Sequence, residues 1–410
     1  MRILLLTQYF PPEIGAPQNR LYELAVRLKN KGASITVVTA LPNYPEMEIY
    51  PEYKGLRSVK EEMDGLQIHR SWIYVKKSKS IAARLLTYFS FVFTSFFTGI
   101  FRAGKADIII CESPPLFLGI TGWFLKKIKG AKLVFNVSDL WPESAEKLGL
   151  VTNKFFLKCA TLLEEFMYRH SELVSGQTQG IVRNISTRFP KVKTHWLPNG
   201  VDFDFFKAEK ESDGWREENS FSERHFLLLY AGILGHAQGL EVILKAAERF
   251  RKNELIRFII VGSGPEKEKL ISMKNQLGLD HVHFYDSVSK AEMPAIISAA
   301  NAAIIPLKRL ELFKGAIPSK IFETLAMKKP ILLGVEGEAK ELFIEQASAG
   351  LAFTPEDDGD LAKKIMKLYN SRETISGLGE NGYNFVRENF SRDKTAEEFW
   401  KQLQMLIGET

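Results

Sequence analysis

A lysine and a glutamate three residues apart stand at the start of an expected helix, in segment 317–323. Pro318 and Ser319 are residue types that begin helices, so Lys320 falls in the first turn, where its charge opposes the helix dipole. That mismatch indicates a bound anion. Glu323 lies on the same helical face as Lys320. A cation for phosphate beside a carboxylate for vicinal hydroxyls suits a nucleotide sugar, and the alternative is a solvated ion pair.

Three glycine-containing loops, over 11–17, 231–239 and 262–266, each follow an expected strand. Glycine lets backbone N–H groups approach a phosphate closely, although a lone Gly-x-Gly is explained equally well by a tight turn. We therefore predict that the substrate-binding residues are Gly15, Gly232, Gly235, Gln238, Gly264, Val288, Ser319 and Glu323.

The carboxylate of Asp139 lies at the end of an expected strand over 132–137, with one residue between them. It could orient an acceptor hydroxyl, or it could only cap the helix that follows. Lys320 and the helix N-terminus could stabilise a departing phosphate. We predict that Asp139 and Lys320 are the catalytic residues.

Metal ligands are the remaining candidates for chemistry. Asp202 and Asp204 match the Asp-x-Asp signature of metal-dependent transferases, but they stand at an expected hinge beside aromatic residues, which favours a chance match. His281 and His283 alternate along a strand with no third ligand in the sequence nearby. We predict that neither a metal nor another cofactor is bound.

Strand-like and helix-like runs alternate along the whole chain, which is the pattern of parallel sheets covered on both faces. Helices are expected over 19–29, 85–101 and 393–407. The expected strands are 2–7, 34–39, 66–74, 107–111, 132–137, 172–175, 194–197, 225–230, 257–261, 281–285, 302–306, 331–335 and 350–353.

The length suits two domains of about 200 residues each. A polar, charged stretch separates the two runs of strands and indicates a linker. The expected organisation is an N-terminal Rossmann-like domain over 1–203, a linker over 204–224, a second Rossmann-like domain over 225–385, and a C-terminal helix over 386–410 that packs back across the domain junction.

Composition restricts the class of protein and its surroundings. The chain is 45% hydrophobic and 25% charged, as in folded globular proteins. Cys111 and Cys159 offer neither a disulfide framework nor a metal-binding spacing, which favours a cytoplasmic setting. The net charge is +6, without the interleaved aromatic residues of nucleic-acid-binding modules. We expect no nucleic-acid partner.

Residues 85–101 form an uncharged stretch with six phenylalanines. Seventeen residues lie at the lower edge of a spanning length, and Ser and Thr recur among them. The alternatives are a buried or half-buried helix, a helix in contact with a membrane surface, and a true span. Together with the basic residues before it, the stretch predicts peripheral association with the inner face of the cell membrane. Those residues are Lys76, Lys77, Lys79 and Arg84.

Through these segments the chain resembles the retaining GT-B glycosyltransferases of family 4, which make capsule, O-antigen and related polysaccharides. Within that family it is most similar to the fucosamine-transferring subgroup of O-antigen and colanic acid biosynthesis. The resemblance covers essentially the whole chain. It rests on Tyr-Phe-Pro-Pro-Glu at 9–13, Asp-Leu-Trp-Pro-Glu-Ser at 139–144, Ala-Gln-Gly at 237–239 and Pro-Ser-Lys at 318–320.

The resemblance implies two facing Rossmann-like domains with a cleft between them, the first binding the acceptor and the second the nucleotide sugar. It implies a metal-independent, retaining hexosyl or N-acetylaminosugar transfer, in which the leaving phosphate takes the proton of the attacking hydroxyl. The implied donor is a UDP-sugar, with a 6-deoxy-amino sugar as the candidate. The implied acceptor is a lipid-linked saccharide.

The chain departs from the family pattern at three positions. Of the two glutamates in the family signature, the second maps onto Glu323, implying ribose contact, but the first falls at Gly315. Ile233 and Gln238 stand where many relatives carry an arginine and a lysine. Diphosphate binding would then depend on backbone N–H groups and Lys320. The missing carboxylate leaves two alternatives open, a non-catalytic sugar-nucleotide-binding protein and a metal-dependent transferase using Asp202 and Asp204.

Overall fold

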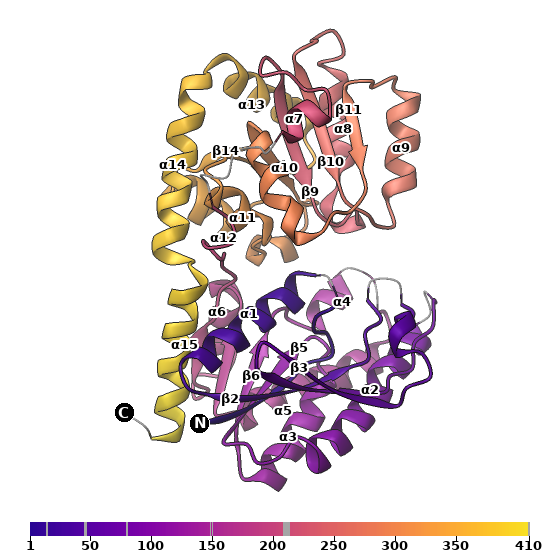
Figure 1. The fold of residues 1–410 in the computed structure, drawn as a ribbon, viewed down its shortest axis with the longest axis vertical. Coiled ribbons are helices and arrows are strands. Elements are labelled where there is room, and N and C mark those ends of the chain that lie inside the picture. Colours follow the sequence, from indigo (N-terminus) through magenta and orange to yellow (C-terminus); the bar gives the residue numbers. More distant parts are fainter. Residues whose placement is uncertain are drawn as a thin grey trace. The chain divides into compact units, whose positions relative to one another are not determined.

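The chain forms two compact α/β units, seen in a computed structural model that describes residues 1–13, 15–44, 47–78, 81–147, 149, 151–207 and 214–408. The first unit combines Met1–Asn199 with Arg392–Thr410, and the second is Gly200–Ser391. Each has a mainly parallel sheet with helices on both faces (Figure 1). The predicted pair of Rossmann-like domains is confirmed.

The first sheet has eight strands in the order β3-β4-β2-β1-β5-β6-β7-β8. Its centre is almost wholly apolar, and every residue of β5 is buried, as expected of a parallel strand covered on both faces. The strands are β1 (Arg2–Leu6), β2 (Ser34–Ala40), β3 (Ser58–Met63), β4 (Leu66–Ser71), β5 (Ile108–Ser113), β6 (Lys132–Val137), β7 (Leu173–Gly176) and β8 (Thr194–Trp196).

Helices cover both faces of this sheet. They are α1 (Ala16–Asn30), α2 (Ile81–Phe101), α3 (Leu118–Lys129), α4 (Glu143–Lys147), α5 (Lys154–His170) and α6 (Gln179–Arg188), with a short 3-10 turn, η1 (Pro51–Tyr53).

The edge strand β3 was not predicted from the sequence. It pairs antiparallel with β4, and the two form a hairpin whose turn residues Asp64 and Gly65 both have positive φ. β3 is charged and none of its residues is buried, so it lacks the apolar run that identifies the other strands. The Asp-Gly pair was the sequence signal for it.

The second sheet has six parallel strands in the order β11-β10-β9-β12-β13-β14. They are β9 (Phe226–Ala231), β10 (Ile256–Val261), β11 (Val282–Tyr285), β12 (Ala302–Pro306), β13 (Ile331–Gly334) and β14 (Gly350–Ala352). The helices are α7 (Trp215–Glu218), α8 (Glu241–Glu248), α9 (Lys267–Gln276), α10 (Met293–Ala299), α11 (Lys320–Ala326), α12 (Glu338–Lys340), α13 (Asp358–Asn370) and α14 (Arg372–Asn389), with η2 (His236–Gln238), η3 (Lys290–Glu292), η4 (Glu311–Gly315) and η5 (Glu341–Gln346).

The second part of the expected linker, residues 214–224, is packed into the second unit. Arg216 is buried, and its guanidinium donates to the carbonyl oxygen of Ala299 at 2.8 Å and to Asn301 at 3.1 Å. Residues 208–213, which fall in the same expected linker, lie outside the described residues. A buried arginine with these partners fixes the segment to the unit it precedes.

The last helix, α15 (Arg392–Ile407), belongs to the first unit although the whole second unit precedes it in the chain. Ala396, Phe399 and Leu403 are fully buried in the same apolar cluster as residues of α1 and β1. Asp393 accepts a hydrogen bond from Arg27 of α1 at 2.7 Å. The helix therefore completes the core of the first unit.

Helix α2 has two distinct faces. Phe91 and Ser95 are fully buried where the helix packs on α3, β2 and β4. Phe93 and Phe101 on the other face are 65% and 77% exposed. Among the described helices, α2 contains a segment, Ala83–Phe101, that is long and apolar enough to cross a membrane. Only 28% of this segment is buried inside the protein. This pattern is that of a half-buried helix with an apolar outer face.

Candidate active site

The order of strands defines where a ligand would bind in the second unit. The chain runs from β9 to β10 and β11 on one side and then returns to β12 on the other side of β9. The loops that follow β9 and β12 therefore diverge, and ligands of open α/β sheets bind in the crevice that such loops form.

The two glycine loops that follow β9 and β10 are packed backbone to backbone. Gly232, Gly262 and Gly264 all have φ between 138° and 154°, which disfavours any residue with a side chain. A Cβ on Gly262 would collide with the Gly232 carbonyl, and one on Gly264 would collide with that of Leu234. The glycines at 262 and 264 are thus explained by packing, whereas Gly232 is exposed.

Lys320, the first residue of α11, extends over the β9 loop. Its ammonium lies 3.8 Å from the centre of the Tyr230 ring and would lie 2.8 Å from a Cβ on Gly232. Burial lowers the pKa of Lys320 to about 7, and the Glu323 carboxylate opposes that shift. A desolvated ammonium at a glycine loop stabilises an incoming anion strongly.

The residues beside Lys320 leave room for a ligand. Ser319 occupies the N-cap position of α11 but has a helical backbone, and its hydroxyl makes no capping bond. Glu323 is half-buried one turn along the helix. A Cβ on Gly315 would meet no atom within 4 Å, so the position of the missing family carboxylate is open space.

The other predicted residues of this unit differ in their surroundings. A Cβ on Gly235 would lie 2.8 Å from the side-chain oxygen of Gln238, so these two residues are neighbours in η2 and its cap. Val288 is half-buried in the segment after β11, a different strand from the one that precedes Gly235. Ile233 is 53% exposed in the β9 loop.

The first unit has its own switch point between β1 and β5, and Gly15 lies in the loop after β1. Its backbone is extended, so its φ does not require glycine. Instead, a Cβ there would collide with the buried side chain of Gln18. Close packing against Gln18 therefore explains the glycine at position 15 as well as a bound ligand would.

Glu13 joins two loops at this edge of the first sheet, a role that sequence reasoning missed. Its buried carboxylate accepts hydrogen bonds from the backbone N–H of Phe10 at 3.1 Å, Asn43 at 2.8 Å and Tyr44 at 2.9 Å. Burial raises the pKa of Glu13 to about 7. Glu13 fixes the loop after β1 to the long loop over 41–53, of which residues 45 and 46 lie outside the described part.

Asp139 lies after β6, as expected, and its carboxylate accepts a hydrogen bond from the Ser144 hydroxyl at 2.7 Å. Ser144 is the second residue of α4, so this bond joins the loop after β6 to the start of that helix through two side chains. Burial raises the pKa of the Asp139 carboxyl, and the bond from Ser144 opposes that shift. Both the capping interpretation and the catalytic role of Asp139 remain predictions.

A buried polar network lies beneath this edge and was also missed. Arg20 of α1 donates to Glu112 at 2.6 Å and to Ser138 at 2.8 Å. Asn136 donates to the second oxygen of Glu112 at 2.5 Å and accepts from Ser175 at 2.6 Å. These residues come from α1, β5, β7 and the end of β6. The network therefore fixes the residue immediately before Asp139.

The candidate metal ligands form no cluster within the described ranges of the chain. The Asp202 carboxylate accepts from the backbone N–H groups of Asp204 at 2.9 Å and Phe205 at 3.2 Å, which closes a local turn. His281 contacts the Ala247 carbonyl at 2.9 Å. Local structure thus accounts for the Asp-x-Asp spacing.

Comparisons with known proteins agree with this architecture. Residues 15–200 match the glycosyl transferase 4-like domain, and residues 211–385 match the glycosyl transferases group 1 family. The two matches lie on successive halves of the chain and together identify it as a GT-B glycosyltransferase of the group 1 and 4-like families, with two Rossmann-like domains.

Individual relatives extend over most of the chain. A protein of Escherichia coli K12 that is assigned to colanic acid biosynthesis as a glycosyl transferase, WcaI, is 29% identical over 334 residues, or 80% of this chain and 81% of its own. Sucrose-phosphate synthase of Thermosynechococcus elongatus has a TM-score of 0.79 at 17% identity, covering 100% of both chains. HepE of Anabaena, solved with UDP-glucose, has a TM-score of 0.72 at 16% identity, covering 99% and 100%.

Proposed function

We propose that this glycosyltransferase moves a sugar, with retention of configuration, from a UDP-sugar to a lipid-linked saccharide acceptor in surface polysaccharide biosynthesis. The observation that carries the proposal is the ammonium of Lys320, half-buried over Tyr230 and against Gly232 at the switch point of the second sheet. It is a site for the diphosphate of a nucleotide sugar.

In the proposed reaction Lys320 and the backbone N–H groups of the β9 loop hold the diphosphate. As the glycosidic bond to the diphosphate breaks, negative charge grows on the departing oxygen, and the ammonium stabilises it. The acceptor hydroxyl attacks from the same face of the sugar and transfers its proton to that oxygen. Glu323 would hold the ribose hydroxyls, and Asp139 would orient the acceptor.

The donor is proposed to carry uracil and a 6-deoxy-amino sugar. The base is supported by HepE, whose structure contains UDP-glucose, and by the GT-B fold that it shares with this chain. The pathway is supported by the similarity to WcaI. The sugar rests on the subgroup resemblance alone.

A panel of UDP-, GDP- and TDP-sugars tests the donor. We expect a UDP-amino sugar to raise the melting temperature of the wild type and to be hydrolysed slowly, with both effects lost in Lys320→Met. Binding without hydrolysis or transfer, for any donor and with lipid-linked acceptors present, would favour the non-catalytic alternative. A stronger response to another base would overturn the proposed donor.

The acceptor-side unit is proposed to dock on the cytoplasmic face of the cell membrane. Five apolar side chains recur every three or four residues along the outer face of α2, and all are more than 40% exposed: Leu86, Phe89, Phe93, Phe97 and Phe101. Phe124 and Ile128 of α3 are exposed as well. An apolar face this long on a soluble unit indicates a contact surface.

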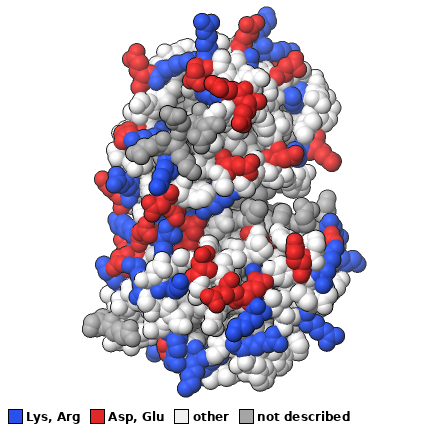
Figure 2. All heavy atoms as spheres, viewed as in Figure 1, with Lys and Arg blue, Asp and Glu red and all other residues white. Residues whose placement is uncertain are grey.

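Basic residues lie beside this face. Lys76, Lys77 and Arg84 are exposed, although Lys77 is 3.3 Å from the Glu48 carboxylate, and Lys79 lies outside the described residues. Figure 2 shows Lys and Arg gathered at the bottom of the view, over the part of the first unit where α3 lies in Figure 1. Each such cation near an anionic membrane contributes on the order of 1 kcal/mol.

Vesicle flotation tests the docking. Replacing Phe93, Phe97 and Phe101 by serine should abolish binding to vesicles without unfolding the protein, because these side chains are exposed. A variant with Lys76, Lys77, Lys79 and Arg84 replaced by glutamine should bind anionic vesicles more weakly than the wild type and bind neutral vesicles equally well. If the wild type binds neither neutral nor anionic vesicles, the docking proposal is wrong.

A further inference from the structure

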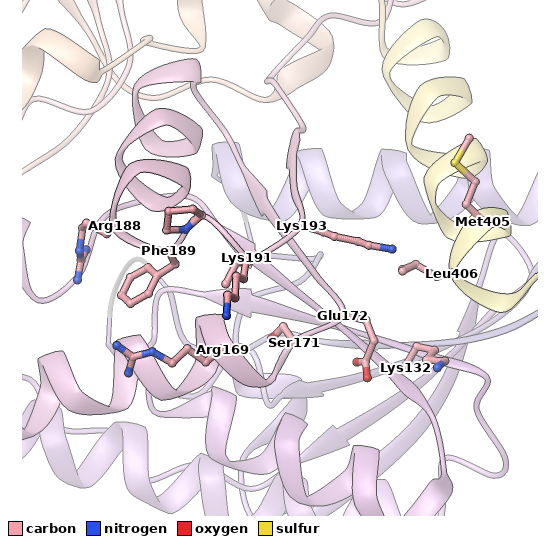
Figure 3. A pocket seen from close by; sticks show the side chains of 12 residues that line it. Lys132, Arg169, Ser171, Glu172, Arg188, Phe189, Lys191, Lys193, Met405 and Leu406 are labelled. Atoms are coloured by element: carbon pink, nitrogen blue, oxygen red, sulfur yellow. The ribbon is translucent and has the colours of Figure 1, made fainter.

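A second concave site lies in the first unit, at the amino-terminal edge of its sheet (Figure 3). Its volume of about 770 Å³ is in the range of small-molecule sites. The walls come from the starts of β6, β7 and β8, the ends of α5 and α6, and the end of α15. The lining includes Lys132, Lys191, Lys193, Phe189, Glu172 and Met405.

The charge of this pocket is strongly positive. Its lining has five cations, the three lysines with Arg169 and Arg188, against one carboxylate, that of Glu172. The two arginines are neutralised, because Arg169 is 3.0 Å from Glu165 and Arg188 is 2.9 Å from Glu164.

The three lysines differ from these arginines. Among the residues that the structure describes, no carboxylate forms an ion pair with Lys132, Lys191 or Lys193. All three are exposed on the pocket wall. Three unpaired ammonium groups around one concavity suit a phosphate ester.

Met405 and Leu406 form an apolar wall on the α15 side of the pocket. Phe189 is buried beneath two guanidinium groups, with Arg169 4.8 Å and Arg188 5.1 Å from its ring centre. On the α15 side, Met405 is 58% exposed next to Leu406, and the Lys193 side chain extends toward them in Figure 3. A free anion would gain nothing from this wall, whereas an ester with an apolar chain would.

Helix α3 reaches the rim of the pocket through one ion pair. Lys126, in the last turn of α3, is 2.8 Å from the Glu172 carboxylate at the pocket rim. The same helix carries the exposed Phe124 and Ile128, and Phe124 contacts Phe96 of α2 with ring centres 5.9 Å apart. Helix α3 thus contacts the pocket rim through Lys126 and carries its exposed apolar residues on another face.

The pocket is separate from the candidate active site. Lys132 is the first residue of β6, and Asp139 follows the last one. Six residues of strand place these two ends about 17 Å apart. An occupant of the pocket would therefore not take part in the transfer.

We propose that this pocket binds the phosphate of an anionic phospholipid headgroup, with Lys132, Lys191 and Lys193 as its ligands. The Met405 side would receive the first part of the acyl chain or glycerol. This goes beyond the proposed function, because no step of the transfer involves the pocket.

The test compares two triple variants of the full chain, without donor or acceptor. One replaces Lys132, Lys191 and Lys193 by serine. The matched control replaces three exposed lysines of the second unit by serine, Lys252, Lys363 and Lys367. In sedimentation with vesicles containing 30% phosphatidylglycerol, we expect the pocket variant to bind about 100-fold more weakly than the wild type, and the control to bind like the wild type.

Short-chain ligands distinguish the two sources of phosphate. Dihexanoyl phosphatidylglycerol below its micelle concentration should raise the melting temperature of the wild type more than glycerol phosphate or inorganic phosphate does. Met405→Ser should reduce only the lipid effect. Equal vesicle binding by the two triple variants, or equal protection by glycerol phosphate and the lipid, would overturn the proposal.

Discussion

Replacing Lys320 by methionine removes the charge at the β9 loop and keeps the length and apolar stem of the side chain. Burial lowers the pKa of this lysine from 10.5 to about 7. A bound diphosphate would restore the charged form, so binding should take up a proton above pH 7. The affinity for a UDP-sugar should then fall by a factor of about 1 + 10^(pH−7), or roughly 30-fold between pH 6 and pH 8.5.

The lowered pKa of Lys320 also affects the free energy of unfolding of the ligand-free protein, with the opposite dependence on pH. Between pH 7 and 10.5 the unfolded chain binds more protons at this lysine than the folded one, so the stability of the wild type rises with pH in that window. Below pH 7 both states are protonated and the cost of the buried charge is complete, on the order of 5 kcal/mol. Lys320→Met should therefore melt at a higher temperature than the wild type at pH 6, with a smaller difference at pH 10.

Titration calorimetry at pH 6, 7 and 8.5, in buffers of different ionisation enthalpy, measures both the affinity and the proton uptake. Lys320→Met should bind weakly and without pH dependence. Lys245→Met, an exposed lysine on α8, is the matched control and should behave like the wild type. A wild-type affinity that is independent of pH, or an unchanged affinity in Lys320→Met, would refute the placement of the diphosphate.

Three further outcomes are expected. Glu323→Ala should weaken donor binding at least tenfold with the melting temperature unchanged, as calorimetry and thermal denaturation would reveal, because the carboxylate is needed for ribose and not for packing. Transfer should persist in EDTA, and loss of activity that Mn²⁺ restores would revive the role of Asp202 and Asp204. Glu112→Ala should lower stability by several kcal/mol in urea denaturation, because it leaves Arg20 buried without a carboxylate; a change below 1 kcal/mol would contradict this.

The arrangement of the sheets could be predicted because their strands are continuous apolar runs. β5 and β12 are buried at every residue, and such runs separated by helices have few topologies open to them. β3 could not be found in that way, because its side chains are charged and it is held by pairing with β4. Composition could not distinguish the outer face of α2 from its buried face, because phenylalanine occurs on both: Phe91 is buried and Phe93 is exposed.

The residues of the candidate site likewise fall into those that the local sequence predicts and those that depend on distant partners. The position of Lys320 in a first helical turn could be predicted from Pro318 and Ser319 and is confirmed, whereas its role as a ligand-binding residue remains a prediction that rests on the unfavourable charge at that position. The roles of Glu13 and Arg20 depend on partners 30 and 92 residues away, in Asn43 and Glu112. No local pattern contains that information, because the contacts arise only once the parallel strands have placed their carboxyl ends together.

The place of α15 has a consequence for how the chain is made. The first unit lacks its last helix until residues 392–410 leave the ribosome, after the whole second unit, Gly200–Ser391, has been synthesised. At roughly 5 to 20 residues per second, this delay is about 10 to 40 s. During it the apolar residues of α1 that Phe399 and Leu403 will cover remain bare. The half that begins first is therefore finished last, and we expect the nascent chain to expose these apolar residues of α1, where a chaperone could bind, until the final turns of α15 arrive.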